Sequence, residues 1–431
     1  MPTTSKARTL TLDIDLMADL TGFGSATRET EAHRRIAKHY ASPLLIGPAV
    51  SDGLMAWVMH LYTEDEADLV QHLPPLWPRT AAAVARKSGR GRPDVEAVLT
   101  RLADHKQVIA SVGNPRRYTI LPVVPGTMEM VLITTDPSTR NAWHRGFAKL
   151  FEDLWESGYI TDYLHLSRPP VRYLPVAAAG RSLYRAWPSD HLEEILEPYD
   201  DFAVASCQCR MAMALLGKGC GKPLDNCTSI GPMAQYLIDR DMARRVDRAE
   251  VLAVKREAEE HGAITWMMNE FHSHQGNISC SCCACCCHGL RTLSEHNAPG
   301  AISKPHFLPR KRPELCTLCK KCVTVCPTKA WKVVPDPSVP PKGKRARARG
   351  GPGERLIFDQ ARCVGCGLCV VGCKAGALDL VPVEDAPPPE TSYVDLILKM
   401  APSFAVNSAR VFLQRVFGPA GPTGPHLHGR P

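Results

Sequence analysis

Apolar residues recur at helical spacing early in the chain, between residues 93 and 107. The apolar positions that fit one face of a helix are Val95, Val98, Leu99 and Leu102. Pro93 suits the first turn of this helix, and a shorter helix is expected at 79–88. Two strand-like runs follow at 108–112 and 116–121, joined by a Gly-Asn-Pro turn. The pattern therefore predicts two helices followed by a hairpin.

Helix, turn, helix and hairpin in that order resemble a winged-helix domain, which we place at 51–135, after an N-terminal arm or helical cap at 1–50. In such a domain, basic side chains of the second helix and the wing contact phosphates. The candidates here are Arg90, Arg92, Arg101, Arg116 and Arg117. The same helix carries acidic residues that would repel DNA, namely Asp94, Glu96 and Asp104. The alternative is a protein-interaction or packing module with solvated charges, so nucleic acid is not the favoured partner.

Further along, the pattern predicts one helical unit, two cysteine-containing units and a tail. Residues 136–200 place aromatic and aliphatic side chains on one face and are expected to form a helical connector. A helical Cys-rich domain is expected at 201–300, and a last compact unit at 306–383. The tail at 384–431 contains one amphipathic stretch near 391–417, which we expect Pro402 to break. The predicted fold class is α+β and multidomain.

Length and composition bound the class of protein. A chain of 431 residues is expected to form about two to four domains, and 44% hydrophobic residues argue against general disorder. We find no apolar run of the roughly 18 residues that a membrane-spanning helix needs. Residues 1–40 are rich in charge and have no apolar core followed by a cleavage site. We therefore expect a cytoplasmic protein without a membrane span; the sequence leaves its oligomeric state open.

Cysteine carries the strongest chemical signal. The chain has 18 cysteines, and none precedes Cys207. Disulfides belong mainly to oxidising compartments, so without an export signal this dense spacing indicates metal ligation. Bound clusters also change the charge: a cubane with four thiolates carries about −2, so two of them bring a chain of formal charge +8 to about +4. Basicity is therefore a weak argument for nucleic acid.

Eight of these cysteines form an internal repeat. Cys316-x₂-Cys319-x₂-Cys322-x₃-Cys326 is followed, 47 positions later at each cysteine, by Cys363-x₂-Cys366-x₂-Cys369-x₃-Cys373. Three cysteines spaced by two residues let one tight loop wrap a cubane, with backbone N–H groups aimed at its sulfurs. A repeat of this kind predicts a unit with approximate two-fold symmetry.

This pattern resembles the bacterial-type two-[4Fe–4S] ferredoxin family over residues 306–383. In that family the fourth cysteine of each run ligates the other cluster. The resemblance thus implies one cluster on Cys316, Cys319, Cys322 and Cys373, and a second on Cys363, Cys366, Cys369 and Cys326. It also implies single-electron transfer. Two features depart from the family: Lys374 stands where a proline is expected, and a long basic insertion separates the halves.

The alternative for these eight cysteines is zinc. Cys₄ zinc sites use paired C-x₂-C, but they do not need a third cysteine at the same step or the C-x₃-C-P ending. We therefore favour clusters.

Ten further cysteines lie upstream. All of them, or a subset, are candidate ligands of one or two additional iron–sulfur clusters. They are Cys207, Cys209, Cys220, Cys227, Cys280, Cys282, Cys283, Cys285, Cys286 and Cys287. Together with the C-terminal repeat they resemble uncharacterised iron–sulfur proteins of anaerobes, which implies redox work and no particular reaction. Structural zinc and redox-active free or disulfide-forming thiols remain alternatives.

The spacing of the second upstream block allows one geometric expectation. If residues 280–287 are extended, alternation puts Cys280, Cys282 and Cys286 on one face, and Cys283, Cys285 and Cys287 on the other. Adjacent thiolates do not easily serve one metal centre, so two faces indicate two sites, or one site with some buried thiols. The nearby histidines, each more often a packing or surface residue than a ligand, are His272, His274 and His288.

These observations rank three functions. The first is an electron-transfer protein or redox-enzyme subunit that serves a redox partner protein or enzyme complex. The second is an oxidoreductase whose catalytic centre lies in the Cys-rich 207–287 region, with catalytic residues that the sequence does not identify. The third is a redox-sensing winged-helix regulator. No phosphate-binding loop, dinucleotide fingerprint or hydrolase elbow points elsewhere.

Overall fold

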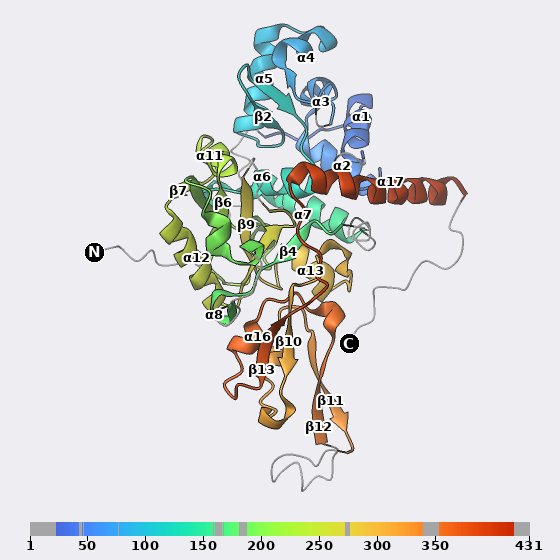
Figure 1. Cartoon of the computed structure of the whole chain (residues 1–431). Coiled ribbons are helices and arrows are strands. Elements are labelled where there is room, and N and C mark those ends of the chain that lie inside the picture. Colours follow the sequence, from blue (N-terminus) through green and yellow to red (C-terminus); the bar gives the residue numbers. More distant parts are fainter. Residues whose placement is uncertain are drawn as a thin grey trace.

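The chain forms three units, stacked one on another in the view of Figure 1. The structure is a computed structural model, and it describes residues 23–42, 45, 47–75, 77–157, 159, 166, 168–180, 188–271, 276–338 and 353–417. An N-terminal helical unit lies at one end, a six-stranded sheet unit in the middle, and the two halves of the cysteine repeat at the other end. The last helix runs back beside the N-terminal unit.

The N-terminal unit begins with three helices, α1 (Glu31–Tyr40), α2 (Asp52–Leu61) and α3 (Glu64–Val70). Thr63 fixes the start of α3 through a capping box with Glu66. Residues 1–50 were expected to be an arm or a helical cap, and for α1 the first of these alternatives is wrong. Ile36, Ala37 and Tyr40 of this helix are buried in the hydrophobic core, because its apolar face packs on α2 and α3.

The predicted pair of helices and the hairpin follow in order. They are α4 (Ala81–Ser88), α5 (Arg92–Asp104), β2 (Ala110–Val112) and β3 (Arg117–Thr119), and the short strand β1 (Arg79–Thr80) completes an antiparallel sheet of order β1-β3-β2. The winged-helix class itself stays a prediction.

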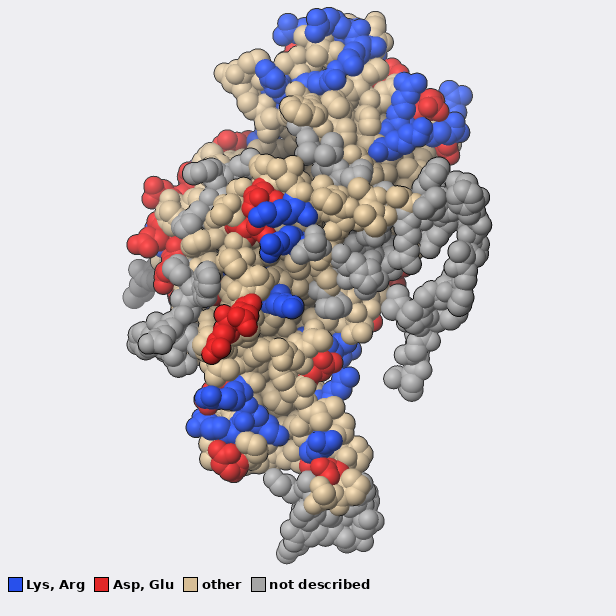
Figure 2. Space-filling model, turned by 45° about the vertical axis from the view of Figure 1, so that its right-hand side comes forward, with Lys and Arg blue, Asp and Glu red and all other residues tan. Residues whose placement is uncertain are grey.

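Lys and Arg side chains gather over this unit on the face seen in Figure 2. Four of the five arginines considered for phosphate binding are nevertheless ion-paired within the unit. Arg90 pairs with Asp65 and Arg101 with Glu66, at 2.6 and 2.8 Å. Arg92 lies 3.7 Å from Glu96, and Arg116 pairs with Asp104. These ion pairs agree with the interpretation that the charges serve the fold rather than a nucleic acid.

Two helices lead from this unit to the next, α6 (Met128–Leu132) and α7 (Ala142–Glu156), with a 3₁₀ turn between them at Pro137–Thr139. The buried aromatic face of α7, which the sequence predicted, packs on α2. The same helix also contacts α10 of the sheet unit, so it joins the two units.

The middle unit is built on a six-stranded antiparallel sheet of order β4-β8-β9-β6-β5-β7. Its strands are β4 (Val171–Tyr173), β5 (Phe202–Ser206), β6 (Asp225–Ile230), β7 (Arg244–Val246), β8 (Ile264–Met268) and β9 (Asn277–Cys282). Along β5, Phe202 and Val204 face helix α12 (Arg248–Glu260), whereas Ala203 and Ala205 face α11 (Pro232–Ile238). The sheet is thus covered on both faces.

The prediction of a helical connector at 136–200 and a helical Cys-rich domain at 201–300 is therefore wrong in part. Strand β4 lies within the first range, and five strands lie within the second. The physical reason is burial on both faces: β5 reads as an uninterrupted buried run, and periodicity does not distinguish such a run from a helix. The remaining helices here are short, namely α8 (Ala177–Gly180), α9 (Leu192–Leu196), α10 (Gln208–Leu215) and α13 (His288–Ser294), with 3₁₀ turns at Pro188–Asp190 and Pro299–Ala301.

The cysteine-repeat module joins its two ends through β10 (Phe307–Lys311) and β13 (Leu378–Pro382), which pair antiparallel. Strands β11 (Trp331–Asp336) and β12 (Gly353–Phe358) form a second antiparallel pair, and most of the basic insertion between them, 339–352, lies outside the described residues. Each half contributes a short helix, α14 (Lys321–Val325) or α16 (Leu368–Val371), and a 3₁₀ turn, Pro313–Leu315 or Gln360–Arg362.

The repeat is visible in the backbone angles. Leu318, Lys320 and Lys329 have φ of +57°, +63° and +57°, and the residues 47 positions later, Gly365, Gly367 and Gly376, have +71°, +76° and +61°. Left-handed backbone favours glycine. The second half has glycine where neighbours crowd it, because a Cβ at Gly367 would lie 2.4 Å from the Cβ of Ala179. Lys320 occupies the equivalent place on an exposed surface.

After the module the chain returns to the sheet unit and ends in α17 (Tyr393–Phe417). Leu396 and Met400 of this helix are buried in the main core. Pro402 was expected to break the helix, and that prediction is wrong, because the helix continues through it. Residues 418–431 of the predicted tail lie outside the described residues. No helix among the described residues is long and apolar enough to span a bilayer.

The contact between the second half-repeat and the sheet unit generates a first prediction. Gly367→Ala places a Cβ against Ala179 in a left-handed conformation, and we expect it to lower the free energy of unfolding by about 2 to 5 kcal/mol. Lys320→Ala is the matched control, since it sits at the equivalent position and already tolerates a Cβ, and we expect a change within about 0.5 kcal/mol. Denaturation of anaerobically prepared protein measures both, and equal effects would contradict the packing argument.

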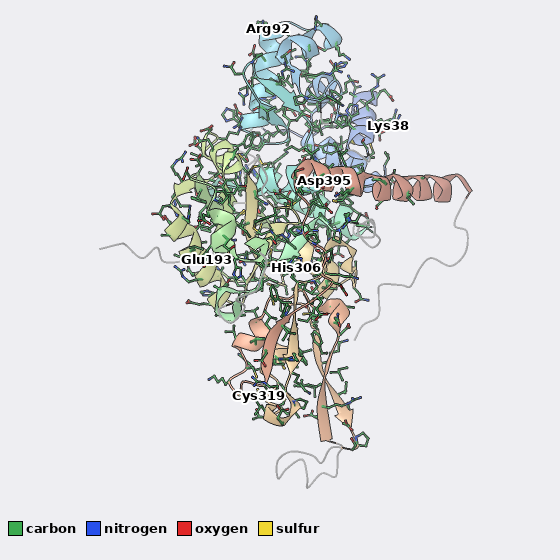
Figure 3. The ribbon with its side chains drawn as sticks, in the orientation of Figure 1. Lys38, Arg92, Glu193, His306, Cys319 and Asp395 are labelled. Carbon is green, nitrogen blue, oxygen red and sulfur yellow. The ribbon has the colours of Figure 1, made fainter. Side chains whose placement is uncertain are left out.

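A second prediction concerns His306, which lies where the module joins the sheet unit (Figure 3). Its Nδ1 is 2.7 Å from a carboxylate oxygen of Asp190, and its Nε2 is 3.0 Å from the carbonyl oxygen of Pro387. Burial lowers the pKa of His306, but Asp190 outweighs that effect, so the pKa lies above its ordinary value of 6.5. The stabilisation of the fold by the contact between protonated His306 and Asp190 is therefore fully present below about pH 6.5, and it is lost as the pH rises through the elevated pKa of His306.

The measurement is thermal unfolding of the wild type and of His306→Gln from slightly acidic to alkaline pH. We expect the difference in stability between the two proteins to be largest at acidic pH and to shrink as the pH rises. A difference that grows with pH would show that the sign is wrong.

Candidate metal centres

The eight cysteines of the module line two separate cavities. Cys326, Cys363, Cys366 and Cys369 line the one nearer the sheet unit, and we call them the proximal set. Cys316, Cys319, Cys322 and Cys373 line the other, and we call them the distal set. Each set thus combines three cysteines of one half with the fourth of the other. These are the groupings that the sequence predicted; that they ligate clusters stays a prediction.

Backbone N–H groups point at the sulfurs of these sets at equivalent places of the repeat. The N–H of Ala330 donates to Cys326 Sγ at 3.2 Å, and the N–H of Ala377 donates to Cys373 Sγ at 3.3 Å. In the proximal set the N–H of Gly365 also donates to Cys363 Sγ, at 3.4 Å. Hydrogen bonds to sulfur favour the thiolate and tune the potential of a bound cluster.

Burial acts on the proximal thiols in the opposite direction. It raises the pKa of Cys363 to about 11 and that of Cys369 to about 12, and it raises the pKa of Cys366 as well. For Cys369, the indole N–H of Trp331 offsets part of this increase. These three groups are held as thiolates at neutral pH only if a positively charged core compensates them, which is the donor chemistry that a cubane requires. The residues present therefore fit the cofactor.

The ten upstream cysteines divide into two groups. Four of them, Cys220, Cys283, Cys285 and Cys286, form what we call the turn set, whose sulfurs all lie within 4.8 Å of one another. The other six, Cys207, Cys209, Cys227, Cys280, Cys282 and Cys287, form what we call the sheet set. Hydrogen bonds between sulfurs run through five of them in the order Cys227, Cys280, Cys282, Cys287 and Cys209.

The arrangement of residues 280–287 differs from the expected one. The strand ends at Cys282, and residues 284–286 form a turn, so alternation between two faces does not extend past Cys282. A turn lets neighbouring side chains converge, and the adjacent residues Cys285 and Cys286 belong to the same set. The predicted faces are therefore wrong: Cys286 lies apart from Cys280 and Cys282, and Cys287 lies with them.

Two cysteines of the sheet set also begin helices. Cys207 precedes α10 and Cys287 precedes α13. Burial acts to raise the pKa of both thiols, while the backbone N–H of Arg210 acts to lower that of Cys207 and the backbone N–H of Leu290 acts to lower that of Cys287. Both thiols therefore lie at helix N-termini, where backbone N–H groups favour the thiolate.

Close contacts between thiols lower the pKa of some cysteines and raise the pKa of their partners. The contact with Cys227 lowers the pKa of Cys280, and the contact with Cys209 lowers that of Cys287. The partners Cys209 and Cys227 show the reverse shift. In the turn set, contacts with Cys220, Cys285 and Cys286 lower the pKa of Cys283, and Cys220 itself has a pKa of about 6. A bound cation would replace the shared protons.

Polar side chains that the sequence did not single out support both sets. Gln208 Nε2 donates to Cys227 Sγ at 3.1 Å, and Arg210 Nε donates to Cys283 Sγ at 3.5 Å. Both are almost fully buried. Their only sequence signal is their place beside Cys207 and Cys209, which does not distinguish them from solvated residues.

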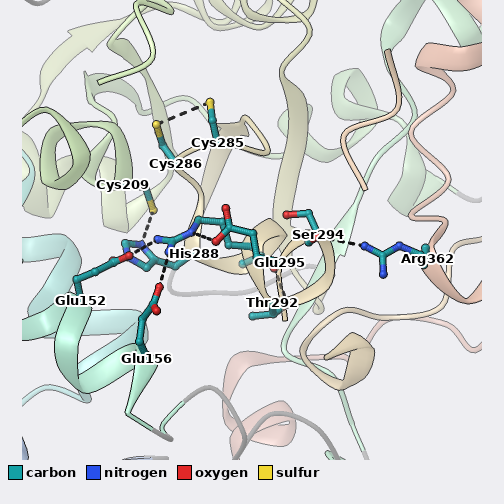
Figure 4. A network of polar contacts seen from close by, with 12 residues as sticks. Glu152, Glu156, Cys209, Cys285, Cys286, His288, Thr292, Ser294, Glu295 and Arg362 are labelled. Carbon is teal, nitrogen blue, oxygen red and sulfur yellow. Dashed lines mark hydrogen bonds and ion pairs between the residues drawn. The ribbon is translucent and has the colours of Figure 1, made fainter. Parts of the chain in front are cut away.

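His288 links the sheet set to α7, as Figure 4 shows. Its Nδ1 lies 3.4 Å from Cys209 Sγ and its Nε2 lies 2.9 Å from Glu152 Oε2, so both ring nitrogens are engaged. Burial would raise the pKa of Glu152, but His288 and Arg291 outweigh it and hold that pKa at about 2. His288 thus contacts a candidate ligand. His272 and His274 lie outside the described residues.

Lys255 reaches the sheet set from α12 and is also buried. Its Nζ donates to the carbonyl oxygen of Ser279 at 2.7 Å. Burial lowers its pKa to about 8, although the nearby thiols Cys280, Cys227 and Cys282 act to raise it. Lys255 lines a cavity of about 200 Å³ with Glu259, whose pKa burial raises to about 7. The sequence showed only a charged helix here.

One segment of the chain matches a known family. Residues 315–378 match a 4Fe-4S dicluster domain. No curated protein and no solved structure matches the chain. The match indicates that the module binds 4Fe-4S clusters, and together with the many cysteines it supports an iron–sulfur electron-transfer role. The matched segment covers both the proximal and the distal sets.

The indole N–H that reaches Cys369 generates a third prediction. Trp331→Phe keeps an aromatic ring but removes this donor, which is worth about 1 kcal/mol, so we expect the proximal reduction potential to fall by roughly 40 mV. The distal potential is the internal control, because Leu378 occupies the equivalent place there. Redox titration followed by EPR measures both, and equal shifts would contradict a local hydrogen-bond effect.

Proposed function

We propose that this protein transfers single electrons through two [4Fe–4S] clusters of the module and one further iron–sulfur cluster held by the sheet set. The proximal and distal sets would each ligate one cubane, and a subset of the six sheet-set cysteines would ligate the third. A bound cubane supplies one-electron redox chemistry at a potential set by its surroundings. The protein contributes ligation, spacing and hydrogen bonds to sulfur.

The observation that carries this proposal is a continuous apolar core between the proximal set and the sheet set. Cys366 of the proximal set and Cys282 and Cys287 of the sheet set belong to the same buried cluster of side chains. Tyr173, Val176 and Ala179 belong to it as well and lie along the segment that connects them. Such a core excludes water from the space between the two sets and holds their separation fixed.

The connecting segment is short. The N–H of Val176 donates to the carbonyl oxygen of Cys366 at 2.9 Å, and the Tyr173 hydroxyl contacts Cys287 Sγ. Tyr173 and Val176 are three residues apart, which is at most about 11 Å of chain. A second connection runs along α13, which begins next to Cys287 and ends where Arg362 donates to the carbonyl oxygen of Leu293 at 2.8 Å. Arg362 in turn precedes Cys363.

The distal set is suited to exchange electrons with a partner. Cys319 is exposed and lies toward the far end of the module (Figure 3). Lys311, Lys320 and Lys321 line the same cavity, so this end presents positive charge. An acidic redox protein would be attracted to it by complementary charge. We therefore place the partner at the distal set and the end of the route at the sheet set.

Iron and sulfide counting tests the third cluster. If it is a cubane, anaerobically purified protein should contain about twelve irons and twelve acid-labile sulfides per chain, and Cys280→Ser should lower both by about four. Ser281→Ala is the matched control, because Ser281 is the buried neighbour and its hydroxyl has no hydrogen-bond partner among the described residues. A wild type with about eight irons would contradict the third cluster.

A second experiment tests the route through the proximal set. Reduction of the wild type is followed by freeze-quench EPR and compared with that of Cys326→Ser, which removes one proximal ligand. We expect the sheet-set signal to be reduced much more slowly in the variant, while the distal signal is reduced at the wild-type rate. Unchanged reduction of the sheet set would contradict a relay through the proximal set.

A second candidate function is an oxidoreductase whose chemistry occurs at the sheet set. The observation that favours it is the cavity beside Lys255, where burial shifts the pKa of the buried Lys255 and of the half-buried Glu259. The test adds cyanide or carbon monoxide to reduced protein. A change in the sheet-set EPR signal would indicate an open iron and support this function, and an unchanged signal would favour pure electron transfer.

A further inference from the structure

The turn set differs in size from every other cysteine group that the structure describes. Its four sulfurs all lie within 4.8 Å of one another, with Cys220 and Cys283 at 4.0 Å and Cys285 and Cys286 at 3.9 Å. Among the described residues, which include all 18 cysteines, no three sulfurs of the module or of the sheet set are so close together. The sulfurs of the turn set therefore lie closer together than those of the proximal and distal sets.

This spacing fits a single metal ion. Zinc binds cysteine sulfur at about 2.3 Å in a tetrahedron, which separates the sulfurs by roughly 3.8 Å. A cubane places four irons and four sulfides between its ligands and so holds the thiolates farther apart, as in the proximal and distal cavities. Two of the measured sulfur separations lie within a few tenths of an ångström of the zinc value. The turn set is therefore too compact for a cubane.

We propose that Cys220, Cys283, Cys285 and Cys286 bind one tetrahedral Zn²⁺ ion, separate from the iron–sulfur clusters. The ion would join the loop between α10 and β6, which carries Cys220, to the turn between β9 and α13. Four ligands of the protein fill its coordination sphere, which is the closed arrangement of a structural zinc site. The ion is not itself a redox centre.

Arg210 supports this proposal independently of the sulfur spacing. It is 4% exposed, and its Nε donates to Cys283 Sγ at 3.5 Å. Its other nitrogens donate to the carbonyl oxygens of Ser281 and Pro223, so it holds both segments that carry the ligands. Four thiolates around a divalent ion have a net charge of −2, and a buried guanidinium needs an anionic partner of this kind.

The experiment compares the only two cysteines that are exposed, Cys285 of the turn set and Cys319 of the distal set. Both are replaced by serine in the full-length protein, which is purified anaerobically with zinc and iron supplied. Zinc, iron and acid-labile sulfide are then measured per chain after challenge with a zinc chelator. Because both side chains are at the surface, the same substitution should disturb the fold equally little.

We expect about one zinc per wild-type chain. Cys285→Ser should lose that zinc and keep the iron and sulfide of the wild type, whereas Cys319→Ser should keep the zinc and lose iron and sulfide. Loss of about four irons and four sulfides from Cys285→Ser, or a wild type without zinc, would overturn the proposal. These outcomes are separate from those for the third cluster, which are measured in Cys280→Ser.

Cobalt substitution gives a readout that does not depend on counting. The wild type loaded with Co²⁺ should show the intense visible absorption of a tetrahedral cobalt thiolate. Cys220→Ser, a second variant in the other segment, should weaken or abolish it, while Cys319→Ser should retain it. Equal cobalt spectra in Cys220→Ser and the wild type would contradict ligation by the turn set.

Discussion

A thiol that is buried resists ionisation, yet a metal centre needs it as a thiolate, and this conflict governs where the cysteines lie. Burial alone raises the pKa of Cys363 and of Cys207 well above the ordinary thiol value. Each group is therefore placed where positive charge or N–H donors oppose the effect: backbone N–H groups in the module, helix starts and Gln208 in the sheet set, Arg210 in the turn set. In the module these donors are close in the sequence, whereas Gln208 and Arg210 come from a segment distant from the sulfurs they reach.

The same constraint explains why the middle unit is a sheet. Strands bring residues far apart in the chain to fixed spacings, and β6 and β9 are hydrogen-bonded neighbours that carry Cys227, Cys280 and Cys282. The two short helices that begin after Cys207 and Cys287 place backbone N–H groups near those sulfurs, which act to lower the pKa of the two thiols. A helical bundle would offer ligands at intervals along one element, whereas here the strands β6 and β9 and the starts of the helices α10 and α13 bring them together.

The sequence predicted the module well because its information is local. Spacing of two residues defines each loop, and the 47-residue repeat relates Cys326 to Cys373 with no knowledge of tertiary structure. The hairpin after α5 could be predicted equally well, from its Gly-Asn-Pro turn. The turn of residues 284–286 was not, because Ala284 between cysteines carries no turn signal, and an extended run was the simplest interpretation. Glu152 and Lys255 were missed because their partners, His288 and Ser279, become neighbours only in the folded chain.

The two halves of the module have the same backbone but different surroundings. Gly365 and Gly367 are hemmed in by Pro305, Phe307 and Ala179, whereas Leu318 and Lys320 face outward. Substitutions at Gly365 and Gly367 therefore disturb the packing of the module on the rest of the protein, whereas a substitution at the exposed Lys320 does not. The surface around Lys320 can therefore change its charge and shape without loss of packing, whereas the surroundings of Gly367 admit no larger side chain. A duplicated module that is anchored through one half can thus come to dock a different redox partner on its other half while it binds the same clusters.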